Sequence, residues 1–214
     1  MLSHAELARL AGAAYRGPWS GRVALDCKYD LLPRDGEVVV VMPGTDPADP
    51  LDWLRDLDAR PRCFPEIGVC HAGFGAGATM IAGKVAPALA GERRLLTVAG
   101  HSLGGALALA LGALLIARGY RVRVVTFGAP RVAFFCNFAL CRLAREAGEL
   151  AEYRRAGDPV PAVPPRPFYK PVTRGIALGV ALPDPPGVVG EIAGKIGNHD
   201  IRLYASDLAA REAA

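Results

Sequence analysis

Residues 95–105 read LLTVAGHSLGG, in which Gly100, Ser102 and Gly104 form the pattern Gly-x-Ser-x-Gly. An apolar run before the pattern is typical of a buried strand, and an alanine- and leucine-rich run after it is typical of a helix. A serine at such a turn has a strained backbone, which the flanking glycines tolerate because they lack clashing side chains. The turn also sets the hydroxyl beside the unpaired amides of the helix start. Ser102 is therefore predicted to be a nucleophile that attacks a carbonyl carbon.

Strands and helices alternate on both sides of this turn. Upstream, Glu37–Met42 contains four consecutive valines, which predicts a strand buried on both faces and central in a parallel sheet. Downstream, a helix to about Arg118 is followed by the stretches 122–127 and 150–156, which are predicted to be two more strands. The other expected elements are helices over 3–15, 72–90, 133–147 and 200–211, and strands over 22–30 and 173–179. This order predicts an α/β fold with a mostly parallel central sheet flanked by helices.

The length, the net charge and the first residues of the chain indicate its domain number, its partners and its location. The 214 residues are enough for one sizeable core, so residues 1–214 are predicted to form a single domain. The net charge of +4 comes from scattered arginines without a basic run, which argues against a nucleic-acid partner. Glu6 and Arg9 interrupt what would be the apolar core of a secretory signal, and no apolar run is long enough to cross a membrane. We therefore expect no transmembrane segment and a cytoplasmic location.

The five cysteines do not form a metal-binding pattern. None of them has the Cys-x-x-Cys spacing of a zinc site, so no metal is expected. Cys63 and Cys70 flank a short loop, where either a disulfide in an oxidising compartment or two free thiols is compatible with the spacing. Free thiols are the favoured interpretation.

A nucleophilic serine requires a histidine base, which normally follows it in the chain order Ser, Asp or Glu, His. Of the four histidines, His4 and His71 precede the serine. His101 adjoins Ser102 and, by strand alternation, points away from it, so it is interpreted as a packing residue that supports the turn. Only His199 lies downstream, just before the expected closing helix. His199 is therefore the predicted base.

The acid that orients the histidine is predicted to be Asp158. It follows the strand expected at 150–156, and the carboxyl edge of a parallel sheet is where functional groups gather. Asp184 lies between two prolines, which favours a turn, and Asp200 adjoins His199 too closely to reach its Nδ1. The alternative for Asp158 is a turn-forming residue before a proline.

A short amphipathic segment follows the loop Pro43-Gly44-Thr45. Within Leu51–Asp58, the apolar residues Trp53, Leu54 and Leu57 alternate with charged ones. Such a segment is expected to cover the site in water and to turn its apolar side toward lipid at an interface. The alternative is an ordinary surface helix packed on the core.

The sequence resembles the class 3 lipases, a family that includes the fungal triacylglycerol lipases. The resemblance covers about Ala5 to Tyr204. It rests on ordered motifs: Pro43-Gly44-Thr45, Asp52-Trp53 with Asp56-Leu57, His71-Ala72-Gly73-Phe74, the Gly100–Gly104 turn, Thr126–Val132, Gly157–Val160 and His199-Asp200. It implies an α/β-hydrolase fold, hydrolysis of carboxylic esters and a triad of Ser102, Asp158 and His199. It also implies an oxyanion hole from Thr45 and Leu103, a lid around Trp53, and no cofactor or metal.

The expected function is that of a serine hydrolase that cleaves lipid esters through an acyl-enzyme. Its expected partners are a lipid or small-ester substrate and a transient lipid interface. Three alternatives use the same triad, namely a phospholipase A1, a small-ester esterase and an acyltransferase. A fourth is a catalytically silent lipase-like interaction module, against which the complete set of serine, aspartate and histidine argues.

Overall fold

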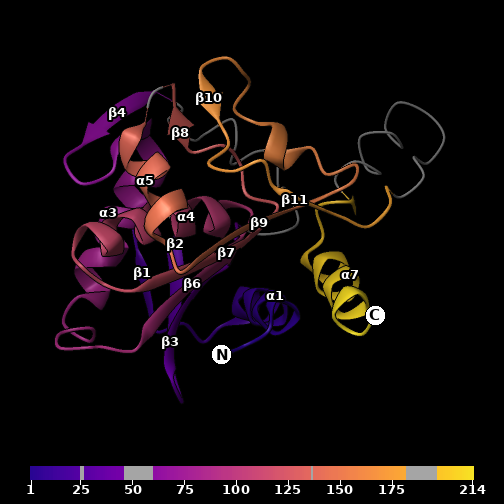
Figure 1. Cartoon of the computed structure of the whole chain (residues 1–214), viewed down its shortest axis with the longest axis horizontal. Helices are drawn as coiled ribbons and strands as arrows, with labels where there is room; N and C mark the ends of the chain where they lie inside the picture. The colour runs from indigo at the N-terminus through magenta and orange to yellow at the C-terminus, as the bar shows by residue number, and fades with distance from the viewer. Residues whose placement is uncertain (25–26, 46–59, 136, 182–196) are drawn as a thin grey trace.

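The computed structural model describes residues 1–24, 27–45, 60–135, 137–181 and 197–214 (Figure 1). A seven-stranded sheet with the order β1-β2-β3-β6-β7-β9-β11 forms its centre. The first three strands are antiparallel, and every pairing from β3 to β11 is parallel. The strands are β1 (Gly21–Val23), β2 (Cys27–Arg34), β3 (Glu37–Met42), β6 (Leu95–His101), β7 (Val122–Phe127), β9 (Glu149–Arg155) and β11 (Ile176–Leu178). The predicted mostly parallel central sheet is confirmed.

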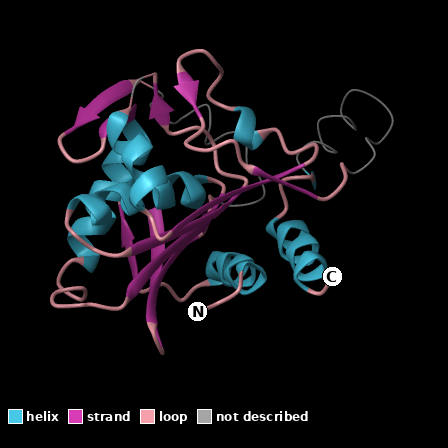
Figure 2. Ribbon diagram, in the orientation of Figure 1, coloured by secondary structure: helices cyan, strands magenta, loops and turns pink. Residues whose placement is uncertain are grey.

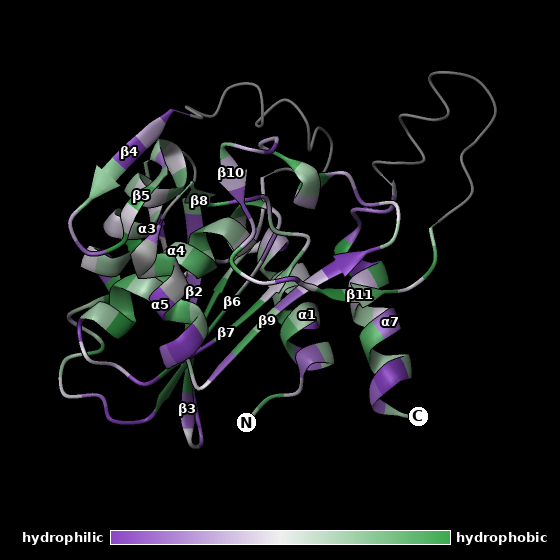
Figure 3. Ribbon diagram, turned by 45° about the horizontal axis from the view of Figure 1, so that its top comes forward, coloured by the Kyte–Doolittle hydropathy of each residue, from purple (hydrophilic) through white to green (hydrophobic). Residues whose placement is uncertain are grey.

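Helices cover both faces of this sheet (Figures 1 and 2). One layer consists of α3 (Ala72–Val85), α4 (Leu103–Ala117) and α5 (Phe138–Glu146), and the other of α1 (His4–Ala13) and α7 (Ile201–Glu212). The valines of β3 are buried on both faces of the sheet. Val38 and Val40 belong to the core under the first layer, and Val39 and Val41 belong to the core under the second. Hydropathy follows the same pattern, with apolar strands between the layers and a polar C-terminal end of α7 (Figure 3).

The helices α1 and α7 pack against each other in antiparallel directions. Ser3 and Glu6 form a capping box at the start of α1. Near this end, the amide of Ala5 donates a 2.9 Å hydrogen bond to Oε1 of Glu212 at the end of α7. Near the other end, Gly12 lies against Ile201, where an added Cβ would stand 3.5 Å from Cγ2 of the isoleucine. The two helices therefore run side by side over most of their length.

Several element boundaries differ from the sequence-based expectations. The strand expected over 22–30 is an antiparallel hairpin of β1 and β2. The helix expected over 72–90 ends at Val85, because Pro87 lacks the amide hydrogen that a continuing helix requires. The helix expected over 133–147 is preceded by β8 (Ala133–Phe134), and α5 begins after Asn137, whose side chain caps it.

A second sheet with the order β10-β8-β5-β4 contains the two cysteines whose pairing the spacing left open. Its further strands are β4 (Pro61–Phe64), β5 (Gly68–His71) and β10 (Tyr169–Lys170). Cys63 stands opposite Val69, and Cys70 stands opposite Arg62, so the two thiols point to opposite faces of the hairpin. Both are free; Cys63 is exposed, whereas burial raises the pKa of the Cys70 thiol to about 12.

Candidate active site

The backbone of Ser102 has the strained conformation that the sequence predicts for a turn between a strand and a helix. Its φ of 56° lies in the left-handed region that non-glycine residues rarely occupy. A Cβ on Gly100 would collide with the carbonyl of Gly104, and one on Gly104 would collide with the carbonyls of Met42 and Pro43. The two glycines therefore allow β6, α4 and the end of β3 to meet closely around the serine.

His199 and Asp158 lie within hydrogen-bonding distance of each other. Nδ1 of His199 stands 2.8 Å from Oδ2 of Asp158, and both side chains are buried. Because a carboxylate only accepts hydrogen bonds, Nδ1 carries the proton and Nε2 keeps a free lone pair. The other carboxylate oxygen, Oδ1, accepts from the amide of Val160 at 2.9 Å. The imidazole is thus held in the tautomer that can take up a proton at Nε2.

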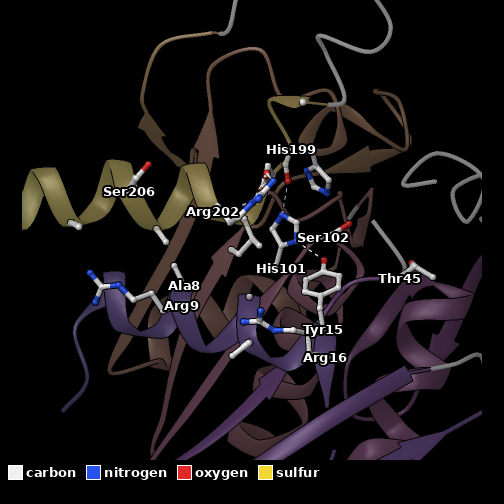
Figure 4. A pocket seen from close by; sticks show the side chains of 17 residues that line it. Ala8, Arg9, Tyr15, Arg16, Thr45, His101, Ser102, His199, Arg202 and Ser206 are labelled. Carbon is white, nitrogen blue, oxygen red and sulfur yellow. Dashed lines mark hydrogen bonds and ion pairs between the residues drawn. The ribbon is translucent and has the colours of Figure 1, made fainter. Parts of the chain in front are cut away.

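Ser102 and His199 line one cavity of about 820 Å³ (Figure 4). Nε2 of His199 is buried and has no hydrogen-bond partner among the residues that the structure describes. Within the same residues, no hydrogen bond joins it to the hydroxyl of Ser102. The structure therefore joins His199 to Asp158 directly and brings Ser102 to the same cavity without a serine–histidine bond.

Thr45 and Leu103, the predicted oxyanion donors, both lie near Ser102, because Thr45 lines the same cavity and Leu103 follows the serine in the chain. Leu103 is the first residue of α4, whose opening amides have no partner within the helix. Thr45 lines the cavity, and its buried hydroxyl has no hydrogen-bond partner in the described part of the chain. Gly44 brings this loop close, since a Cβ there would stand 2.9 Å from Cβ of Ser102.

His101, interpreted from the sequence as a packing residue, makes defined polar contacts. Its Nε2 lies 2.9 Å from the carbonyl oxygen of His199, and its Nδ1 lies 2.6 Å from the hydroxyl of Tyr15 (Figure 4). A carbonyl only accepts, so Nε2 donates and Nδ1 accepts from Tyr15. The ring also stacks on His199, with centroids 4.5 Å apart. Burial, followed by the proximity of His199, lowers the pKa of His101 well below its usual value, so this ring stays neutral.

Tyr204 and Arg155, which the sequence did not reveal as site residues, support Asp158 and the segment before His199. The hydroxyl of Tyr204 donates to Oδ2 of Asp158 at 2.5 Å and accepts from the amide of Arg155 at 3.0 Å. Burial and the nearby Asp158 raise the pKa of Tyr204 well above its usual value, which keeps the phenol a donor. The guanidinium of Arg155 donates to Asn198 at 2.6 Å and thereby fixes the residue before His199. The sequence did offer one signal for Tyr204: its polar hydroxyl lies on the side of the closing helix that faces the core.

Trp53, Leu54 and Leu57 lie in 46–59, outside the described residues, so the lid stays a prediction. Across the described ranges, no three His, Cys, Asp or Glu side chains gather as a metal site would require. None of the described helices combines the length and the apolar composition needed to cross a bilayer.

Comparison with known proteins identifies relatives of this chain. The profile of the family "Lipase (class 3)" matches residues 39–168. A secreted mono- and diacylglycerol lipase of Fusarium solani is 31% identical over 140 residues, which are 60% of this chain and 40% of that relative. This chain therefore spans well under half the length of the Fusarium protein.

Solved structures show the same fold. Lip2 lipase from Yarrowia lipolytica is 20% identical and superposes with a TM-score of 0.66 over 92% of this chain and 90% of the Lip2 chain. A lipase from Rhizopus microsporus var. chinensis is also 20% identical, with a TM-score of 0.68 over 85% of this chain and 74% of that one. Together with the parallel sheet and its two helix layers, these similarities confirm the α/β-hydrolase fold.

The expectation of a cytoplasmic location is contradicted by the Fusarium relative, which is a secreted protein. The structure explains why the first residues led to a wrong prediction of the location. Glu6 and Arg9 belong to α1, a surface helix of the folded domain that packs on α7. Their charges are therefore those of an ordinary amphipathic helix and carry no information about targeting.

The family profile covers more than half of the chain and includes the strained serine turn as well as the loop of Asp158. This match agrees with the resemblance found in the ordered sequence motifs. The chain belongs to the class 3 lipase family.

Proposed function

We propose that this protein hydrolyses carboxylic esters of lipids, with Ser102 as nucleophile, His199 as base and Asp158 as the residue that orients the base. One observation carries the proposal. His199 is held by Asp158 in the tautomer with a free Nε2, and this buried, unpartnered nitrogen belongs to a cavity that Ser102 also lines. A buried lone pair at a cavity is suited to accept a proton from a group that reacts there.

The reaction proceeds in two halves. Nε2 of His199 takes the hydroxyl proton of Ser102 while Oγ attacks the ester carbonyl, and the tetrahedral intermediate then expels the alcohol, which receives that proton. Water next attacks the acyl-enzyme by the same route and releases the carboxylic acid. Asp158 remains ionised and stabilises the imidazolium that forms in each half. The hydroxyl of Tyr204 and the amide of Val160 each donate a hydrogen bond to one carboxylate oxygen, which fixes the position of the carboxylate.

The negative charge that develops on the carbonyl oxygen requires donors that are already in position. We assign this role to the amides of Thr45 and Leu103, together with the positive end of the α4 dipole. The hydroxyl of Thr45 is a further candidate, because it is buried without a partner among the described residues. One donor of this kind is worth about 10²-fold in kcat or more.

The substrate class is assigned from two features. Alanine, glycine and isoleucine form much of the cavity wall, which suits an apolar acyl group, and the Fusarium relative is named as a lipase of mono- and diacylglycerols. A phospholipase A1 or an acyltransferase would use the same triad. Product analysis with triglyceride, diglyceride and phospholipid substrates, in the presence and absence of an acceptor alcohol, separates these activities.

A fluorophosphonate probe tests the proposal directly, because it labels only an activated serine. We expect native protein to be labelled at Ser102, and unfolded protein to remain unlabelled. Ser102→Ala and His199→Ala should each lower kcat by about 10⁴-fold or more while melting at the parent's temperature. Ser20→Ala and His71→Ala, which alter residues away from the cavity, serve as controls that retain labelling. Substantial turnover by pure, folded Ser102→Ala protein would refute the assignment.

A further inference from the structure

Arg155, the last residue of β9, places a buried guanidinium between the segment of the base and the closing helix. Its side chain is 6% exposed. Nη1 donates to Oδ1 of Asn198 at 2.6 Å, and Nε donates to Oδ2 of Asp207 at 2.9 Å. Asn198 directly precedes His199 in the chain, and Asp207 lies on α7. One planar group with fixed donor directions therefore links the end of a strand to both partners.

The backbone of the same residue lies beside the acid of the proposed triad. The carbonyl of Arg155 accepts from the amide of Asp158 at 3.2 Å, and its amide donates to the hydroxyl of Tyr204 at 3.0 Å. That hydroxyl donates in turn to the carboxylate of Asp158. These contacts do not depend on the side chain at position 155. A substitution of the arginine therefore removes the links to Asn198 and Asp207 and leaves the hydrogen bonds of the acid in place.

Two glycines make room for the guanidinium and its partners. Gly157 and Gly179 have φ values of 80° and 57°, which favour glycine. A Cβ on Gly157 would stand 2.8 Å from Nδ2 of Asn198, and a Cβ on Gly179 would collide with the carboxylate of Asp207. The backbone thus approaches both partners of Arg155 closely, and this leaves them little freedom to move.

The base can act only from one position. Nδ1 of His199 has to meet Asp158 while Nε2 stays directed at the group that gives up its proton. The carbonyl of His199 is held by Nε2 of His101 at 2.9 Å. On the other side of the same residue, the chain is held where Arg155 binds Asn198. The histidine is therefore fixed from both directions along the backbone.

We propose that Arg155 is a positioning residue for the reaction, which acts through Asn198 to keep His199 in reach of its proton donor. This inference rests on the proposed ester hydrolysis. A catalytic group displaced by about 1 Å loses up to about 10²-fold in rate. Arg155 is not among the described residues that line the cavity, so its removal should lower kcat and leave KM for a soluble short-chain ester unchanged.

The kinetic test compares Arg155→Met, Asn198→Ala and the double variant on a soluble nitrophenyl ester. Methionine occupies much of the space of the arginine stem and donates no hydrogen bond. Each single variant should lower kcat by about 10²-fold. The double variant should be no slower than Arg155→Met, because both substitutions break one link. Losses that multiply in the double variant would show that the two residues act separately and would overturn the proposal.

Arg118→Met is the matched control, because Arg118 also donates from two nitrogens to its partner. Nε and Nη2 each lie 2.9 Å from the carboxylate of Glu66. Arg118 follows the last turn of α4, whereas Ser102 precedes the first. The control should keep the parent's kcat when all variants are assayed well below their melting temperatures. In case Arg155→Met does not fold, Asn198→Ala breaks the same link without removing the buried guanidinium.

Proton NMR reports the position of the base without turnover. The deshielded Nδ1–H proton of His199, which bonds Asp158, should give a sharp signal in the parent and in Arg118→Met. The signal should broaden or vanish in Arg155→Met and in Asn198→Ala. A parent-like signal in these folded variants, with kcat within about threefold of the parent, would overturn the positioning role and leave ester hydrolysis standing.

Failure of the proposed function has a different signature. A parent protein that hydrolyses no ester and does not react with fluorophosphonate would overturn ester hydrolysis. The NMR comparison of the same variants would still decide whether Arg155 positions His199.

Discussion

Tyr15 joins two parts of the site that are far apart in the sequence. Its hydroxyl donates to Nδ1 of His101, and Nε2 of His101 in turn donates to the backbone of His199. A Cβ on Gly44 would collide with the same tyrosine hydroxyl, so Tyr15 also lies against the loop that carries Thr45. The phenol of Tyr15 thus contacts both the residue that holds the backbone of His199 and the proposed oxyanion loop.

Tyr15→Phe is expected to lower kcat for a soluble short-chain ester about tenfold, which corresponds to roughly 1.4 kcal/mol of lost positioning. Nitrogen-15 NMR of His101 should show a mixture of tautomers in the variant and the Nε2–H form alone in the parent. Tyr120→Phe removes a hydroxyl that donates to Leu89 far from the cavity, and it should change neither measurement. Equal kinetic losses in the two variants would show that the effect of Tyr15 is general destabilisation.

Single residues of the site were predictable where a local rule applies to them. The glycine-flanked turn indicates Ser102, and the usual order of the triad then leaves His199 as the downstream histidine. The supporting contacts of Tyr15 and Tyr204 bridge 86 and 46 positions, respectively. Contacts between residues so far apart leave no periodicity or motif in the sequence, so only the structure reveals them.

The close packing of the elements around Ser102 depends on glycine at particular positions. Gly104 lies in α4, yet its missing Cβ makes room for carbonyls at the end of β3. Gly83 lies in α3, and an added Cβ there would meet nothing within 4 Å. The same residue type is therefore indispensable in one helix and replaceable in the other.

This contrast predicts opposite effects of the same substitution. Gly83→Ala should raise the free energy of unfolding by about 0.8 kcal/mol, because alanine is the better helix former. Gly104→Ala should lower it by about 3 kcal/mol, since the atoms that it meets belong to the backbone and cannot rotate away. Urea unfolding followed by circular dichroism measures both changes. A stable Gly104→Ala protein would contradict the tight junction at the serine.

Elements were predicted well where hydrophobic periodicity is long and poorly where a side chain or a proline sets the boundary. The strands β3, β6 and β7 are mostly apolar, and their positions followed from composition. The start of α5 instead depends on the cap of Asn137. The split of 22–30 into a hairpin depends on pairing between β1 and β2, which composition does not encode.

At the scale of the molecule, two exposed arginines lie beside the cavity that Ser102 lines. Arg9 and Arg16 stand at its edge, and in the described part of the chain neither forms an ion pair or a side-chain hydrogen bond. The net charge of the protein is +4. An anionic lipid surface that approached this side of the protein would be attracted to them.

The double variant Arg9→Gln/Arg16→Gln is expected to bind vesicles of phosphatidylglycerol and phosphatidylcholine about thirtyfold more weakly, at roughly 1 kcal/mol per arginine. The difference should shrink as salt rises, because the charges are exposed and therefore screened. Arg93→Gln/Arg121→Gln removes the same charge near the starts of β6 and β7, at the opposite edge of the sheet, and should bind like the parent. Equal weakening in both double variants would show that only the net charge matters.

The whole molecule was predictable in its fold class and not in its location. Alternating strands and helices restrict a chain to few architectures, so the α/β class followed from sequence. The cellular location was inferred from charges that serve the packing of α1, and the secreted relative contradicts it. The cavity also escaped prediction, because its walls include residues of α1 and α7 from opposite ends of the sequence.

The antiparallel contact of α1 with α7 makes the described chain almost a ring, since Ala5 and Glu212 are hydrogen-bonded. Circular permutation would therefore require only a short linker between these ends and a new opening at Gly119, in the turn between α4 and β7 where an added Cβ meets nothing. In the permuted chain, Asp158 would come first, His199 second and Ser102 third, and every strand would keep its neighbours in the sheet. The geometry of the candidate site therefore does not require the order in which Ser102, Asp158 and His199 occur along this sequence.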